Sequence, residues 1–167
     1  MTIAQKQFPA YLPLPSYPEG TTLAGLGTAE LLLTATLRLY AASCFGEMDG
    51  SDWRGGLARS GAGCCAVPAF GALFEIVAAA ARRPLALHCR HCTALGHDEG
   101  RFLQIVGLLQ HGRMFDARDL LCDWLPPAAM RLAILPAKGL AASLARARLL
   151  VPLRSPKQTH SSSILVH

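Results

Sequence analysis

Aromatic residues, charged residues and long apolar runs are all scarce in this sequence. Of its 167 residues, 7% are aromatic and 16% are charged, whereas 51% are hydrophobic. So few aromatics beside so many Ala and Leu residues favour helices over strands, and the apolar content excludes a disordered chain. The longest apolar runs are shorter than the roughly 20 residues that cross a bilayer, so we expect no membrane contact.

We also expect no secretory leader, because Glu19 and several prolines stand where the apolar core of a signal peptide would lie. We therefore expect a soluble, cytoplasmic protein. The six cysteines stand at positions 44, 64, 65, 89, 92 and 122. They are too few for a disulfide scaffold, and in a reducing compartment they should be free thiols or metal ligands.

Negative charge is missing from the C-terminal end. The net charge is +5, and from Arg131 onward the sequence has six basic residues and no acidic one. This asymmetry indicates an anionic partner, although bases that only cover solvated helix faces give the same pattern. The candidate partner-binding residues of the basic segment 131–157 are Arg131, Lys138, Arg146 and Arg148. Nucleic acid is the less favoured partner, since stacking aromatics are not interleaved with these bases.

The chain is long enough for one domain with a sizeable core. Prolines among apolar residues in 1–20 predict an extended arm, which packs on its own domain or on a neighbouring subunit. Residues 21–153 form the predicted helical domain, with a Gly-rich loop at 44–66 inside it. Residues 154–167 form a predicted polar tail.

The apolar spacing predicts an all-α, single-domain bundle of about six helices. The expected helices cover residues 29–43, 68–82, 98–111, 113–124, 127–135 and 138–150. Thr28 and Asp98 are the expected N-caps of the first and third of these helices. Glu99 is expected in the first turn of the third helix, where the helix dipole favours an acid.

The best-patterned part of the chain is a predicted helical hairpin formed by residues 98–111 and 113–124. Gly112 provides a left-handed stop, and so short a turn forces the two helices to pack antiparallel. The stretch from Leu109 to Leu120 resembles the turn of a tetratricopeptide-type helical pair. The resemblance covers about a dozen residues, without a second copy at the 34-residue period, so it implies a hairpin and no activity.

The densest chemistry lies in the stretch 88–92, which holds two cysteines and two histidines. A Cys-x-x-Cys spacing presents two thiolates to one zinc ion, and the predicted hairpin would bring Cys122 back toward this stretch. The predicted zinc ligands are Cys89, Cys92, His97 and Cys122, with His88 and His91 as alternates. A second Cys-x-x-Cys or a His-x-x-x-His is missing, and cysteines that simply fill space in the core are the competing interpretation.

The same two cysteines, Cys89 and Cys92, could instead form a reversible dithiol–disulfide pair. Neither a nucleophile elbow nor a phosphate-binding glycine pattern is present, so a binding protein is favoured over an enzyme. We therefore predict a non-catalytic interaction or regulatory module; the cluster either holds a structural zinc ion or, in the favoured interpretation, consists of metal-free cysteines and no cofactor is bound. A thiol redox protein and anion binding through 131–157 are the alternatives. The expected partner is an unidentified protein, and a homo-oligomer stays open.

Overall fold

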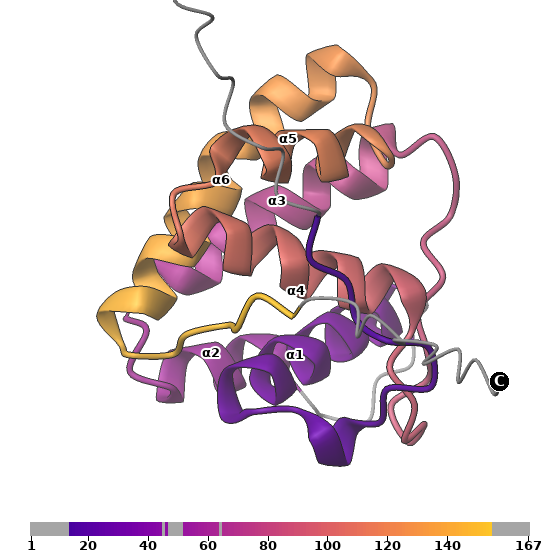
Figure 1. Cartoon of the computed structure of the whole chain (residues 1–167), viewed down its shortest axis with the longest axis vertical. Coiled ribbons are helices and arrows are strands. Elements are labelled where there is room, and N and C mark those ends of the chain that lie inside the picture. Colours follow the sequence, from indigo (N-terminus) through magenta and orange to yellow (C-terminus); the bar gives the residue numbers. More distant parts are fainter. Residues whose placement is uncertain (1–13, 45, 47–51, 64, 155–167) are drawn as a thin grey trace, which may run out of the picture.

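The computed structural model describes residues 14–44, 46, 52–63 and 65–154, and over these ranges the chain is all-helical (Figure 1). Its helices are α1 (Thr28–Cys44), α2 (Trp53–Arg59), α3 (Ala66–Ala80), α4 (His97–Gln110), α5 (Met114–Cys122) and α6 (Pro127–Arg146). The predicted all-α, single-domain fold of about six helices is confirmed. Most of the predicted arm and of the predicted polar tail lies outside the described residues.

The bundle is organised around α4, which runs between α1 on one side and α5 and α6 on the other (Figure 1). Phe102, Leu103, Ile105, Val106 and Leu108 of this helix are all completely buried. The predicted hairpin is confirmed, since α5 packs back on α4 after a turn at Gly112, whose φ is +74°. The longest helix, α6, packs along α3 and also covers α4.

The predicted Gly-rich loop at 44–66 is wrong in part, because it contains the short helix α2. Gly55 and Gly56 have low helix propensity, so the local pattern indicates a loop. The segment is nevertheless helical, because Trp53 and Leu57 of α2 are buried in the core and their packing stabilises the helix. Gly56 faces α1, where a Cβ at this position would be in ordinary van der Waals contact with the Leu32 side chain at 3.5 Å.

The two helices predicted at 127–135 and 138–150 are instead the single helix α6, which contains Pro136. A proline in a helix interior removes a backbone hydrogen bond and costs roughly 3 kcal/mol, which is why the sequence indicates a break. The buried stripe of α6 continues past the proline and consists of Ala133, Ala137, Leu140 and Leu144. Packing of this stripe in the core therefore offsets the cost of the proline.

The start of α1 depends on Glu30 rather than on Thr28, the predicted N-cap, which is the first residue of the helix itself. Gly27 precedes α1, and its backbone N–H donates to the Glu30 carboxylate at 2.6 Å. The carboxylate is completely buried and also accepts two bonds of 2.8 Å from Arg154 and one of 2.6 Å from the Tyr17 hydroxyl. Arg154, predicted to begin a polar tail, thus belongs to the folded body.

The helix α4 begins in the same way as α1. Gly96 is its N-cap, and Glu99 in the first turn accepts the Gly96 N–H at 2.7 Å. The predicted cap, Asp98, is instead buried inside α4. Its carboxylate accepts two bonds from Arg83, at 2.7 and 2.8 Å, and one of 3.0 Å from the Trp124 indole N–H. Asp98 therefore joins the segment after α3 and the end of α5 to α4.

Acid stability should depend on Asp98. Burial raises the pKa of Asp98, but the bonds from Arg83, from the Ala86 backbone N–H and from Trp124 outweigh burial, so this pKa lies below its usual 3.8. Because the folded-state pKa is the lower one, the ionised group stabilises the fold above about pH 4, and this contribution is lost as the pH falls through the folded-state pKa.

We expect the Asp98→Asn variant to be less stable than the wild type at neutral pH and to lose less stability on acidification. The measurement is urea denaturation at a series of pH values between about 7 and about 2. Parallel stability curves for the two proteins would contradict the role given to Asp98.

One helix of the described ranges, α6, is long and apolar enough to cross a bilayer, with a mean hydropathy of 1.3 over 18 residues. It packs against α3 and α4, and 44% of that window is buried inside the bundle. The core helix of a soluble protein has the same length and composition. The structure is therefore consistent with a soluble protein.

Candidate functional site

The Cys/His loop, residues 88–92, belongs to the long connection that runs from α3 to α4 along one edge of the bundle (Figure 1). Arg38 of α1 fastens this connection, because its guanidinium donates to the backbone carbonyls of Cys92 at 2.6 Å and of Ala94 at 2.7 Å. The same guanidinium pairs with Glu99 through two bonds of 2.8 Å, and Glu99 accepts the His88 backbone N–H at 3.0 Å. A buried ion pair thus fixes the path of the loop.

The side chains of the loop point largely to solvent. His88, Cys89 and His91 are exposed, Cys92 is half-buried, and the backbone N–H of Cys92 donates to the Cys89 carbonyl at 3.2 Å in a tight turn. Within the described ranges, no three His, Cys, Asp or Glu side chains form a group that could hold a metal ion. The structure therefore does not gather the predicted set of Cys89, Cys92, His97 and Cys122, and zinc binding stays a prediction.

The redox alternative also stays a prediction. Cys89 and Cys92 are free thiols in one turn. The hydrogen bonds that Arg38 donates to Glu99 are the main reason why the pKa of Arg38 is raised, and the neighbouring Cys92 and Cys89 raise it further.

Beside the start of this connection lies an apolar groove of about 450 Å³ between α1 and α3. Its floor and walls are apolar side chains from three separate parts of the chain: Leu37, Tyr40, Ala41, Phe74, Val77, Ala78, Ala81, Pro84, Leu85 and Leu87. The remaining lining residues are Cys44, Arg82 and Arg83. This arrangement can hold an apolar body with a negative charge at one end.

The wall formed by Tyr40 is fixed by aromatic packing. Its ring lies 5.6 to 5.8 Å from the rings of Trp53, Phe70 and Phe74, measured between centroids. Burial, followed by the neighbouring Cys44 thiol, raises the pKa of Tyr40 to about 12. The hydroxyl is therefore neutral at physiological pH, and it adds no charge to the groove.

A larger cavity of about 680 Å³ lies between residues 14–21, α4 and α5. Its lining includes His97, one of the predicted zinc ligands, and Arg101, which forms an ion pair with Asp123. Burial lowers the pKa of Arg101. The lining mixes opposite charges with apolar atoms, and nothing in it distinguishes one class of ligand from another.

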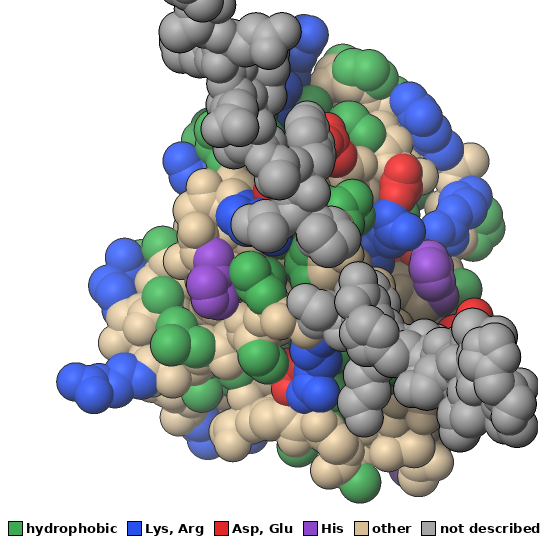
Figure 2. Space-filling view, viewed as in Figure 1, with side chains coloured by type: hydrophobic (Ala, Val, Ile, Leu, Met, Phe, Trp, Pro, Cys, Tyr) green, Lys and Arg blue, Asp and Glu red, His purple; other side chains and the backbone are tan. Residues whose placement is uncertain are grey.

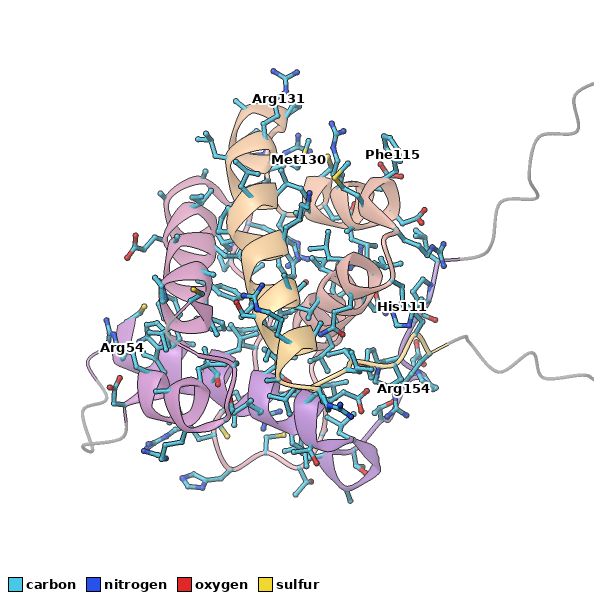
Figure 3. All side chains as sticks on the ribbon, turned by 90° about the vertical axis from the view of Figure 1, so that its left-hand side faces the viewer. Arg54, His111, Phe115, Met130, Arg131 and Arg154 are labelled. Carbon is cyan, nitrogen blue, oxygen red and sulfur yellow. The ribbon has the colours of Figure 1, made fainter. Side chains whose placement is uncertain are left out.

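The predicted partner-binding residues lie on the exposed side of the C-terminal part of the chain. Arg131, Lys138 and Arg146 are exposed on α6, and Arg148 follows the end of that helix with a φ of +60°. Figure 3 shows Arg131 at the N-terminal end of α6, pointing away from the bundle. On the face shown in Figure 2, Lys and Arg side chains stand out around the rim and acidic side chains are few.

Two leucines, Leu132 and Leu135, lie among these bases and are 66% and 70% exposed. Positions 131, 132, 135 and 138 share one side of a helix, because side chains three, four and seven residues apart are neighbours on its surface. We call this set, Arg131, Leu132, Leu135 and Lys138, the α6 face. It combines exposed apolar area with positive charge.

The groove was not predicted, because the spacing of its apolar residues indicates burial in a core. Arg82, at the end of α3, had no predicted role beyond closing a helix. The sequence carries only a weak signal for it, namely two arginines followed by a proline, directly after an apolar segment that ends in four alanines at 78–81.

Comparison of the chain with protein-family models, with curated proteins and with solved structures found no match.

Proposed function

We propose that this protein is a non-catalytic interaction module of the cytoplasm, which binds an acidic surface of a partner protein through the α6 face. The observation that carries the proposal is the pair of exposed leucines, Leu132 and Leu135, between the cations Arg131 and Lys138. Contiguous apolar area rimmed by charge is typical of protein-binding surfaces.

The charge of the α6 face is not compensated by the protein itself. The helix has no acidic residue, and within the described ranges no carboxylate forms an ion pair with Arg131, Lys138, Arg146 or Arg148. Uncompensated cations attract an anionic partner and exclude a basic one. Burial of the two leucines then supplies the apolar part of the binding free energy, at about 25 cal/mol per Å².

A protein partner is favoured over nucleic acid by the spacing of these groups. Arg131 and Lys138 are separated by about 10 Å along the helix, and the space between them is taken by leucine. Phosphate contacts need a denser row of cations, and single-stranded nucleic acid also needs stacking aromatics. An acidic protein surface with an apolar centre matches this pattern better.

The proposal can be tested with a photo-crosslinking amino acid placed at Leu135 and, as a control, at Glu75, which is exposed on α3. Within cells that produce the protein, the Leu135 probe should capture one protein that the Glu75 probe does not. The captured protein, once purified, should bind the wild type directly, and its association rate should fall as the salt concentration rises.

Charge reversal on the α6 face supplies the decisive comparison. The Arg131→Glu/Lys138→Glu variant should bind the captured protein at least about tenfold more weakly, while Arg59→Glu, an exposed site on α2, should bind like the wild type. Equal capture by both probes, or unchanged affinity of the double variant, would overturn the proposal. Capture of a second copy of the chain would do so as well and would identify a homo-oligomer.

A further inference from the structure

We propose that the apolar groove between α1 and α3 is a binding site for a single-chain anionic amphiphile, such as a long-chain fatty acid, whose carboxylate pairs with Arg82. This inference is independent of the function proposed for the α6 face, because the groove and the α6 face share no residue. It rests on the size of the groove, on its apolar walls and on the positive charge in its lining.

The size of the groove fits a small molecule. Its volume of about 450 Å³ lies within the range of roughly 300–1,000 Å³ that small-molecule sites occupy. Its volume therefore matches a small ligand such as an acyl chain.

The lining of the groove selects for an apolar body. Ten of its thirteen residues are aliphatic, aromatic or proline. The Tyr40 hydroxyl, which would otherwise be a polar group in the wall, interacts with the Cys44 thiol. A flexible hydrocarbon chain can pack against these apolar side chains, whereas the polar groups of a polar ligand would lack hydrogen-bond partners in the groove.

The positive charge in the lining of the groove selects for an anionic head. Arg82 and Arg83 are consecutive, but Arg83 is already bonded to Asp98 through both of its terminal nitrogens. Arg82 has an exposed side chain, and no carboxylate in the described part of the chain forms an ion pair with it. Its backbone N–H donates to the Trp124 carbonyl at 2.8 Å, which fixes this residue beside the groove. A carboxylate would find two N–H donors of one guanidinium there.

The test measures binding of oleate to the full chain by isothermal titration calorimetry, with oleyl alcohol as the uncharged ligand of the same length. Oleate should bind with a stoichiometry of one, and oleyl alcohol should bind at least about tenfold more weakly, because it lacks the charge-assisted hydrogen bonds. Absence of oleate binding would overturn the proposal.

Two pairs of variants locate the ligand. Ala78→Trp places a large ring in the groove and should abolish oleate binding, while Ala79→Trp, at the next position and outside the lining, should bind like the wild type. Arg82→Gln should weaken oleate about tenfold and leave oleyl alcohol unchanged, while Arg131→Gln should change neither. Thermal melting confirms that each variant is folded. Equal oleate binding by both tryptophan variants would overturn the proposed site, and unchanged oleate binding by Arg82→Gln would overturn the proposed partner of the carboxylate.

Discussion

Replacing Arg38 with methionine should lower the free energy of unfolding by about 3–5 kcal/mol, the usual cost of removing one partner of a buried ion pair. Arg38 and Glu99 are only 3% and 0% exposed, so the variant leaves the Glu99 carboxylate buried without its cation. The backbone carbonyls of Cys92 and Ala94 lose their donors at the same time. Guanidinium chloride denaturation measures the difference.

An exposed ion pair provides the matched control. The side chains of Arg54 and Asp52 are 60% and 57% exposed, so Arg54→Met should cost at most about 1 kcal/mol. The double variant Arg38→Met/Glu99→Gln should be more stable than Arg38→Met alone, because the buried group is then neutral and still accepts hydrogen bonds. A loss in Arg38→Met no larger than that in Arg54→Met would contradict the structural role of the pair.

Replacing Phe70 with alanine should also cost about 3–5 kcal/mol, since a large buried side chain is lost and a cavity remains. Phe70 is completely buried at the point where four helices meet. The distances from its ring centroid are 5.8 Å to Tyr40, 5.1 Å to Trp53, 4.7 Å to Phe74 and 5.9 Å to Phe102. Urea denaturation measures the loss, and the near-ultraviolet circular dichroism of the aromatic cluster should change with it.

Phe115 is the control for this experiment, because it is 73% exposed at the start of α5 (Figure 3). Phe115→Ala should change the free energy of unfolding by less than about 0.5 kcal/mol. If the two phenylalanine variants were equally stable, the aromatic cluster would not be the centre of the core.

The fold could be predicted from the sequence where local pattern and tertiary packing agree. In α4, the spacing of Phe102, Ile105 and Val106 places one face in the core, and Gly112 forms the turn that ends α4, as expected. Two of the errors, the predicted loop over α2 and the predicted break in α6, arise where packing overrides local preference. Gly55 and Gly56 are helical because Trp53 anchors α2 in the core, and Pro136 is tolerated because the buried stripe of α6 continues past it.

The candidate sites also divide into features that the sequence predicts and features that only the folded structure reveals. The exposure of Arg131 and Lys138 could be predicted from the charge pattern, because a charged side chain without a partner is rarely buried. The groove could not be predicted, since α1, α3 and the segment after α3 form it only after folding. The anchor of the Cys/His loop is equally invisible in the sequence: Arg38 and Glu99 are 61 residues apart. A short pattern cannot reveal which arginine meets which glutamate.

Glu30 has a consequence for the biosynthesis of the protein. It serves both the start of α1 and the attachment of Arg154, which lies 124 residues further along the chain. The loop that this pair closes spans most of the sequence, so its formation carries a large entropic cost and comes late in folding. On the ribosome, the buried glutamate of α1 can find this cation only after the 124 residues up to Arg154 have been made. The contacts around Glu30 therefore form after α6 has been synthesised, and α1 has to stay soluble until then.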